Sequence, residues 1–519
     1  MPSDSGSTTS VWHPFAVPSY PPLVRDERSD VCVVGGGIAG LTTAYLLTLE
    51  GRSVIVLDDG AIGSGETGRT TAHLTAALDD RYVNLERLHG ADGASLAAES
   101  HSVAIDRIEQ IVEAEGIDCE LERVDGFLFV PPGESTEILE RERDAATRAG
   151  LDGLRMVARA PWPSFDTGPC LYFPRQAQLH PLRYLAGLAE RIRARGGRIF
   201  CGTHATGLAG GSVGEVSTLQ GPTVFTDAIV VATNTPVNDR LVMHAKQAAY
   251  RTYVIALPVP AGSVPKGLYW DTADPYHYLR LTGSPVESHE LLVVGGEDHK
   301  TGQAQDLEER FERLERWTRE RFPAAGPVAY RWSGQIIEPV DGMGFIGPNP
   351  MDAANVYIAT GDSGNGMTHG TVAGLLLTDL IMGRENPWLE LYDPARKTPR
   401  AIRELARENV NVAAQYADWV TAGEVDSAEE IAPGTGAIIR RGFGKLAVYR
   451  DAEHAVHAFS AECPHLGCVV RWNAVELSWD CPCHGSRFSP TGRVINGPAN
   501  RDLEPAEEEA APQAGGRKG

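Results

Sequence analysis

The apolar positions of this chain first become regular near residue 30. An apolar strand, a glycine turn, a helix over residues 38–49 that ends before Gly51, and a second apolar strand follow one another within residues 31–57. Two later apolar runs, 228–232 and 356–359, are typical of further strands in the same sheet. The pattern therefore predicts an α/β fold built on a mainly parallel sheet.

Segments outside this sheet predict a second layer and a separate C-terminal unit. Alternating strands such as 291–294 fit an α+β second layer, and apolar residues at helical spacing over 401–419 predict a helix that bridges two domains. Residues 423–436 are acidic and then rich in proline and glycine, as in a linker. We expect, in chain order, an N-terminal extension (1–29), a two-part domain (30–400), a connecting helix (401–422), a small all-β domain (423–505) and a disordered tail (506–519). The first part of the two-part domain covers about 30–80, 181–245 and 330–395, and the second part covers about 85–180 and 246–329.

Composition excludes several classes of partner. The 519 residues carry a net charge of −22, which argues against nucleic acid and against anionic membrane surfaces. No stretch approaches the roughly 20 apolar residues that a membrane span needs. The N-terminus lacks the basic start and apolar run of a secretory signal. A cytoplasmic protein without a membrane span is the simplest expectation.

The eight cysteines are unevenly distributed. Cys32, Cys119, Cys170 and Cys201 are scattered, whereas the other four fall within 463–483 and are interleaved with two histidines. In a reducing compartment, such clustering indicates metal binding before it indicates a disulfide scaffold.

A glycine motif lies between the first strand and the first helix. Gly35, Gly37 and Gly40 form G-x-G-x-x-G, which lets the backbone approach a pyrophosphate at the positive end of a helix. Asp58 ends the second strand, where a carboxylate can accept a hydrogen bond from a ribose hydroxyl. The motif predicts a Rossmann-like dinucleotide site; a glycine-rich turn in an ordinary α/β fold is the alternative.

Two further loops distinguish between FAD and NAD. Residues 63–72 (GSGETGRTTA) and 361–367 (GDSGNGM) resemble the flavin-contacting loops of the D-amino-acid oxidase/glycine oxidase family over about residues 30–395. The resemblance implies that the first part of the large domain binds FAD, that the second part is a substrate domain, and that the helix after the second loop directs its N-terminus at the flavin. The implied FAD contacts, beyond those above, are Arg69, Thr70, Thr71, Gly361, Gly364, Asn365, Gly366 and Met367.

This chain departs from the family in two places. The stretch from Trp332 to Gly342 lacks the arginine of the family's W-x-G-x-R-P, so no carboxylate-anchoring role is expected there. Some relatives attach FAD covalently through a histidine whose position is Arg69 here, so we expect non-covalent FAD. No second G-x-G-x-x-G follows, which disfavours reduction by NAD(P)H.

No general base is evident, and the catalytic residues are unknown from the sequence. The family transfers a hydride from a substrate C–H next to nitrogen to the flavin, so the protein must position that carbon and keep the amine deprotonated. Residues 268–280 hold four aromatic side chains and an arginine that could surround an ammonium group, although Tyr276, Tyr278 and Arg280 also fit one face of an ordinary strand. The candidates are Tyr278, Arg280 and His369, the last of which could equally have a packing role.

The C-terminal motif is the most specific in the chain. CPHLGC at 463–468 and CPCHGS at 481–486 closely resemble the loops of the Rieske family, over about residues 425–505. The resemblance implies a 2Fe–2S cluster with one iron held by Cys463 and Cys481 and the other by His465 and His484. Neutral imidazoles raise the potential to roughly −150 to +300 mV. A tetrahedral zinc site is the alternative.

Details of these loops resemble the cytochrome bc-type Rieske subgroup. There the two other cysteines form a disulfide, which predicts a Cys468–Cys483 bond. Ser486 matches a hydroxyl that donates to the cluster, and residues 497–499 resemble the proline loop that covers it. Phe488 stands where that subgroup has a tyrosine, so we expect a lower potential than in respiratory members.

Together these motifs predict an FAD-dependent oxidoreductase with a built-in relay. An amine or amino acid would reduce FAD, and electrons would pass singly through the cluster to an external acceptor such as ferredoxin, quinone or oxygen. A cluster that feeds electrons to the flavin, and a redox sensor or electron-transfer module without turnover, are the rival hypotheses.

Overall fold

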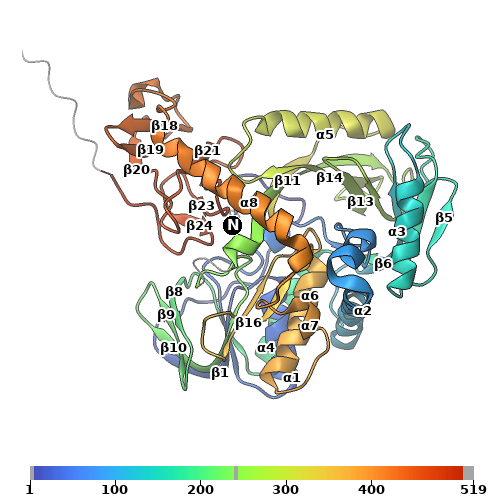
Figure 1. Ribbon diagram of the computed structural model, residues 1–519, viewed down its shortest axis with the longest axis horizontal. Coiled ribbons are helices and arrows are strands. Elements are labelled where there is room, and N and C mark those ends of the chain that lie inside the picture. The colour runs from blue at the N-terminus through green and yellow to red at the C-terminus, as the bar shows by residue number, and fades with distance from the viewer. Residues whose placement is uncertain (1–4, 239–242, 507–519) are drawn as a thin grey trace, which may run out of the picture.

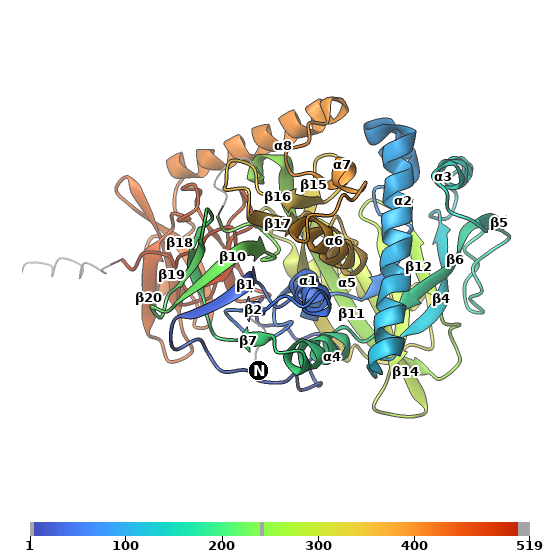
Figure 2. The same ribbon diagram turned by 90° about the horizontal axis from the view of Figure 1, so that it is seen from below.

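The computed structural model describes residues 5–238 and 243–506. Figures 1 and 2 show a helix-covered sheet near β1, a larger sheet that carries β11 and β14, and the C-terminal strands, drawn in red, beside both. No helix among the described residues is long and apolar enough to cross a membrane.

The first sheet carries the glycine turn. β1 (Glu27–Val34) pairs in parallel with β2 (Val54–Leu57) and β10 (Thr223–Val231), so that Val33 lies opposite both Val56 and Val230. Both faces of β1 are buried, which explains its continuous apolar run. The sheet order is β16–β17–β10–β1–β2–β7; in addition, β9 pairs with β10, and β8 pairs with β9. The remaining bounds are β16 Phe345–Pro348, β17 Val356–Thr360, β7 Arg198–Phe200, β8 Ala205–Ala209 and β9 Gly214–Thr218.

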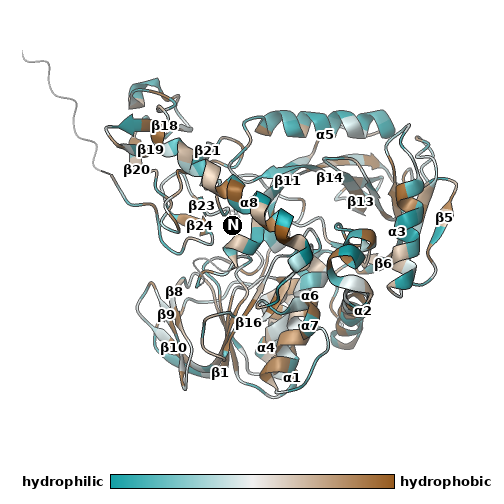
Figure 3. Ribbon diagram, viewed as in Figure 1, coloured by the Kyte–Doolittle hydropathy of each residue, from teal (hydrophilic) through white to brown (hydrophobic). Residues whose placement is uncertain are grey.

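Two helices that cover this sheet pack closely against each other because a glycine allows it. α1 (Ile38–Leu49) and α6 (Gly366–Ile381) are buried along most of their length. A Cβ on Gly374 would lie 2.5 Å from the Thr42 side chain, so only glycine permits this spacing. α4 (Pro181–Ala194) covers the same face, and Figure 3 shows the apolar α1 in contrast with the polar α5 (Leu307–Arg321) on the outside.

The second sheet is larger and mostly antiparallel. Its order is β15–β11–β14–β13–β12–β4–β6–β3, with β5 beside β6. Residues 330–339, which the sequence suggested for the FAD-binding part, form β15, which pairs with β11 in this sheet. The bounds are β3 His73–Leu74, β4 Glu122–Phe129, β5 Arg155–Val157, β6 Cys170–Gln178, β11 Gln247–Pro260, β12 Leu268–Asp271, β13 His277–Gly283, β14 His289–Lys300 and β15 Tyr330–Pro339, with α2 (Tyr82–Glu115) and α3 (Glu137–Arg148) alongside.

The C-terminal region is all β. It consists of two antiparallel sheets, β18–β19–β20 and β21–β22–β23–β24, as the sequence predicts for a small all-β domain. Their bounds are β18 Thr435–Arg441, β19 Gly444–Arg450, β20 Val456–Ser460, β21 Arg471–Asn473, β22 Ser478–Asp480, β23 Arg487–Phe488 and β24 Val494–Asn496. The remaining short helices of the chain are η2 His244–Lys246, α7 Leu389–Tyr392, η3 Pro399–Ala401, η4 Tyr416–Val420 and η5 Ala428–Glu430.

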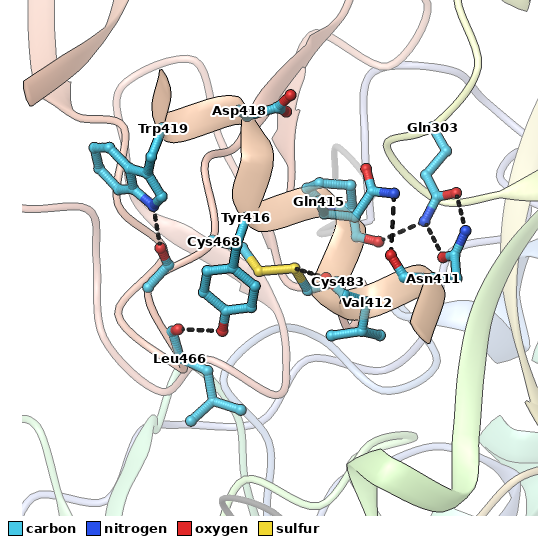
Figure 4. The surroundings of a disulfide bond; sticks show 12 residues. Gln303, Asn411, Val412, Gln415, Tyr416, Asp418, Trp419, Leu466, Cys468 and Cys483 are labelled. Carbon is cyan, nitrogen blue, oxygen red and sulfur yellow. Dashed lines mark hydrogen bonds between the residues drawn. A yellow bond between two sulfur atoms is a disulfide. The ribbon is translucent and has the colours of Figure 1, made fainter. Parts of the chain in front are cut away.

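The expected connecting helix is firmly attached to the C-terminal domain. α8 (Ile402–Gln415) continues into η4, where the Tyr416 hydroxyl donates to the Leu466 carbonyl at 2.6 Å and the Trp419 indole donates to the Gly467 carbonyl at 2.9 Å. Figure 4 shows these side chains over the loop that carries Cys468. The segment therefore supports this loop as well as joining two domains.

The N-terminal extension is packed more deeply than its composition suggests. Trp12 is only 1% exposed, and its indole donates to the Thr70 carbonyl at 2.6 Å. Residues 5–8 pass between the first flavin loop and the C-terminal domain, where the Ser5 carbonyl accepts from Arg487 at 2.6 Å. Of the expected disordered tail, residues 507–519 lie outside the described part of the chain.

Candidate active site and metal centre

The glycine turn after β1 has room only for glycine at two positions. Gly35 has a φ of +111°, and a Cβ there would lie 2.3 Å from the Ala232 carbonyl oxygen. A Cβ on Gly40 would lie 1.9 Å from the Gly35 carbonyl oxygen. The backbone is therefore shaped to bring the N-terminus of α1 against a ligand, as a pyrophosphate requires.

Asp58 is held at the end of β2 beside this turn. Its Oδ2 accepts from the Gly36 N–H at 2.5 Å, and its Oδ1 accepts from the Gly60 N–H at 2.9 Å. Its place at the end of β2 beside the glycine turn is the position at which a dinucleotide fold presents a carboxylate to a ribose hydroxyl.

One continuous cavity of about 290 Å³ runs from the glycine turn to the second sheet. Gly40 packs behind the turn and does not line it. The sequence-predicted residues that do line it are Gly35, Gly37, Asp58, Arg69, Thr70, Thr71, Gly361, Gly364, Asn365, Gly366 and Met367. A cavity of this shape, with a phosphate cradle at one end and a helix N-terminus at the other, fits FAD.

Aromatic side chains and a carboxylate line the end of the cavity formed by the second sheet. Trp270, Tyr276 and Tyr278 line it together with Asp79, and the Tyr276 hydroxyl donates to Asp79 Oδ2 at 3.2 Å. The Tyr278 hydroxyl shares a hydrogen bond with Thr252 Oγ1 at 2.8 Å. Tyr278, a candidate from the sequence, therefore lines this end of the cavity.

Arg280, by contrast, does not line the cavity. Its guanidinium donates to the carbonyls of Ala72 at 2.8 Å and Leu179 at 3.1 Å, and it lies over the Trp12 ring. Strand alternation correctly places it on the face of Tyr276 and Tyr278, but β13 continues beyond the end of the cavity. Arg280, a candidate from the sequence, therefore lies outside the candidate substrate site.

His369 lies in the first turn of α6 and lines the cavity. It is 5% exposed, and its Nε2 has no hydrogen-bond partner among the described residues. Burial lowers the pKa of His369 to about 4, so the imidazole is neutral at physiological pH. A neutral ring that faces the cavity is available for a ligand.

Uncompensated carboxylates surround the aromatic end. Asp79 is open to the cavity but shielded from bulk water, so desolvation and then Asp80 raise its pKa to about 7, against the Tyr276 hydrogen bond and Arg81. Burial likewise raises the pKa of Asp298 to about 7 and that of Glu338 well above its usual range. Within the described ranges, none of these carboxylates forms an ion pair. The cavity end is therefore suited to a cation.

The two cysteine–histidine loops of the C-terminal domain have the same pattern of backbone hydrogen bonds. The Cys463 N–H donates to the Cys468 carbonyl, and the Cys481 N–H donates to the Ser486 carbonyl, both at 2.8 Å. Each loop turns at a glycine in the fifth position with a φ near +78°, which explains the matching C-x-x-x-G spacing. The loops therefore face each other as a pair.

The four predicted ligands converge between these loops. The Cys463 and Cys481 thiols hydrogen-bond to each other, and the rings of His465 and His484 lie 5.0 Å apart. Nδ1 of His484 is buried with no hydrogen-bond partner in the described part of the chain. Two thiols and two imidazoles in one buried group fit a Rieske cluster.

The other two cysteines form the predicted disulfide. Cys468 and Cys483 are bonded to each other and tie the two loops together beside α8 (Figure 4). The sulfur atoms of Cys468, Cys481 and Cys483 lie within 4.8 Å of one another, but the disulfide removes two of these as thiolate ligands. The remaining donor set is the Cys₂His₂ set.

The two loops that carry the predicted cluster ligands (463–468 and 481–486, the cluster loops) lie against the large domain (30–400, the flavin domain). Gln335 Nε2 donates to the Gly485 carbonyl at 3.1 Å, and Gln335 also lines the FAD cavity. The ring of His244 lies 4.7 Å from that of His465 and 5.9 Å from that of His484. One side chain therefore connects the loop of a cluster ligand to the flavin site.

A buried ion network holds the two domains together. Glu476 is 1% exposed, and its Oε1 lies 3.0 Å from Arg69 and 3.4 Å from Arg251, both of the flavin domain. It also accepts from Ser333, whose carbonyl accepts from Arg69 at 2.6 Å. Although burial opposes ionisation, Arg69, Arg251 and Arg487 hold the pKa of Glu476 at about 2. The Rieske domain is thus docked through a charged carboxylate.

The structure places a dinucleotide-binding turn and a site of two thiols and two imidazoles in neighbouring domains. This combination defines the class of protein as a flavin-linked iron–sulfur oxidoreductase. Family models match residues 30–380 as FAD dependent oxidoreductase and residues 420–507 as Rieske [2Fe-2S] domain. The chain belongs to the FAD dependent oxidoreductase family and carries a C-terminal Rieske domain. Its cofactors are FAD and one Rieske cluster.

Known proteins resemble the chain over different lengths. YhfW of Bacillus subtilis, named as a Rieske 2Fe-2S iron-sulfur protein, is 34% identical over 94% of this chain and 95% of its own. Gamma-glutamylputrescine oxidoreductase of Escherichia coli is 26% identical over 72% of this chain and 89% of its own. The structure of glycine oxidase from Geobacillus kaustophilus has a TM-score of 0.60 at 19% identity and covers 72% of this chain and 99% of its own, which shows the fold. The chain is an FAD-dependent oxidoreductase.

Sequence reasoning missed four residues of these sites. Asp79 follows an apolar stretch without a motif, and Glu476 lies in a short hairpin turn. Gln335 and His244 belong to these sites because they contact the C-terminal domain, and the sequence does not indicate those contacts.

Proposed function

We propose that this protein is an amine dehydrogenase in which substrate electrons pass from FAD through the docked Rieske cluster to an external one-electron acceptor. The observation that carries the proposal is the Gln335–Gly485 hydrogen bond, since Gln335 belongs to the wall of the FAD cavity and Gly485 to a cluster loop. When bound, FAD accepts a hydride from a carbon next to the substrate nitrogen, and the cluster carries single electrons.

The cavity end supports a cationic amine as the substrate class. Asp79 offers a carboxylate to an ammonium group, and Tyr276, Tyr278 and Trp270 offer ring faces to the same cation. Arg69 is engaged by Glu476 and Arg280 by backbone carbonyls, so neither anchors a substrate carboxylate. We propose that Asp79 Oδ orients the ammonium group and accepts its proton before oxidation. FAD is held without a covalent bond.

Anaerobic mixing tests the direction of electron flow. The full-length protein is mixed with primary, secondary and methylated amines and with neutral amino acids while flavin absorbance and the cluster EPR signal are followed. Amine-driven bleaching of the flavin followed by reduction of the cluster is expected. Flavin that remains oxidised with every amine, yet is reduced through the cluster by ferredoxin, would refute the proposal and favour the reverse flow.

Replacement of Asp79 by asparagine should weaken the use of cationic amines. Loss of a hydrogen bond to a charged group costs about 1.5–3 kcal/mol, so kcat/KM should fall about 10- to 100-fold. In the wild type, KM should decrease as the pH rises through about 7, where Asp79 ionises, and Asp79→Asn should lose this dependence. Asp274→Asn, on the same loop as Tyr276 but exposed, is the matched control. Unchanged kinetics in Asp79→Asn would exclude the role.

Replacement of Gln335 by leucine should slow electron transfer between flavin and cluster several-fold while amine-driven flavin reduction keeps its rate. Rapid-mixing traces of the two cofactors separate these steps. Gln303 provides the control, because its Nε2 donates to the Pro482 carbonyl of the same loop at 2.8 Å but it does not line the cavity. An equal effect of Gln303→Leu would mean that loop support, and not this contact, sets the rate.

A further inference from the structure

Part of the wall of the FAD cavity comes from the Rieske domain. The residues that contribute belong to β24 and the loop after it: Val494, Ile495, Asn496, Gly497, Ala499 and Asn500. A Cβ on Gly497 would lie 3.2 Å from the Val237 side chain of the flavin domain, so the loop is in contact with the opposite wall. The cavity is therefore incomplete without the last domain of the chain.

Asn496 is positioned by the first flavin loop. Its Nδ2 donates to Glu66 Oε1 at 2.9 Å, and Glu66 Oε2 accepts from the Gln335 N–H at 2.6 Å. No described residue donates to Asn496 Oδ1, which leaves this acceptor for a ligand in the cavity. The side chain is thus oriented before any cofactor binds.

Asn500 fixes the loop beside the ribose end of the cavity. Its Nδ2 donates to the Thr206 carbonyl at 3.3 Å, and its carbonyl lies 3.4 Å from His204 Nε2. The other ring nitrogen of His204 lies 3.4 Å from Asp59, the neighbour of the ribose carboxylate Asp58. The loop therefore lies at the end of the cavity that the adenosine half of a dinucleotide occupies.

The same loop also contacts the cluster site. The Ala499 N–H donates to Ser486 Oγ at 3.0 Å, and the Ser486 hydroxyl hydrogen-bonds to Cys463. Ser486 is fully buried and Ala499 is 3% exposed, so water does not replace this contact. A hydrogen bond next to a cluster ligand influences the potential of the cluster.

We infer that residues 494–500 of the Rieske domain form part of the FAD site, that they bind the adenosine half, and that they transmit its occupancy to the Ser486 hydrogen bond beside the cluster. The inference rests on the two cofactors and not on the proposed substrate or direction of electron flow. A failed amine assay would leave it untouched.

An Asn496→Ala variant tests the contact. Loss of a neutral hydrogen bond costs about 0.5–1.5 kcal/mol, so the Kd for FAD should rise about two- to tenfold. FAD fluorescence on dilution of the holoenzyme gives this Kd, and iron and sulfide content should stay at the wild-type value. Thr491→Ala, in the same hairpin but exposed, should bind FAD as the wild type does. A wild-type Kd in Asn496→Ala would overturn the contact.

ADP tests the coupling without electron transfer, because it carries the adenosine half and no flavin. ADP added to the full-length, FAD-stripped protein should shift the EPR spectrum and the midpoint potential of the cluster toward those of the holoenzyme. Asn496→Ala should need two- to tenfold more ADP for the same shift. ADP that binds without changing the cluster spectrum would overturn the coupling, and this arm requires only the wild-type chain.

Discussion

Replacement of His484 by alanine should leave the protein without its cluster while amines still bleach the flavin. In the predicted ligand set, His465 and His484 hold the second iron, so loss of the His484 imidazole would leave that iron with a single nitrogen ligand. Iron and acid-labile sulfide should fall to near zero, and turnover with a one-electron acceptor should be lost. Metal analysis and anaerobic flavin spectra measure the two effects separately.

The exposed His454 in the same domain is the matched control for this variant. His454→Ala should keep both the cluster and turnover. Loss of amine-driven flavin reduction in His484→Ala, with FAD still bound, would contradict the division of labour between the domains. Zinc without iron in the wild type would overturn the cluster itself.

Replacement of Glu476 by alanine should destabilise the protein by about 3–5 kcal/mol, because it leaves buried guanidinium groups without a counter-charge. Arg69 and Arg251, on the flavin domain, lose their shared carboxylate. Denaturant unfolding should show the loss, and limited proteolysis should release the Rieske domain from its docked position. Glu453→Ala, at an exposed position of the same domain, should change stability by at most about 0.5 kcal/mol.

The same carboxylate predicts how docking depends on pH. The pKa of Glu476 is depressed to about 2 in the folded protein, below its value of 4.5 in the unfolded chain. Its stabilisation is therefore fully present above about pH 4.5 and is lost as the pH falls toward 2. Acid unfolding of Glu476→Ala should lack this component. An acid transition identical to that of the wild type would show that Glu476 does not hold the interface.

The motifs predicted the centres well because their chemistry is local in the sequence. The turn at Gly35–Gly40 and the two cluster loops each place several functional atoms within six residues, so spacing alone defines them. Glu476 could not be predicted, since its partners Arg69 and Arg251 are more than 200 residues away and a single glutamate carries no pattern. Arg280 shows a further limit, because alternation predicts the face of a strand but not where a cavity ends along it.

The contact between the Ser5 carbonyl and Arg487 joins positions 482 residues apart, so the first described residues find their partners only after nearly the whole chain exists. Such separation makes native pairing late during synthesis. The flavin cavity, whose wall includes residues 494–500, is likewise finished last. On the ribosome, the flavin domain therefore emerges with one wall of its FAD cavity missing. Capture of FAD should wait until the C-terminal domain has been made. Maturation of the iron–sulfur centre and of the flavin site is thereby tied to one final assembly event.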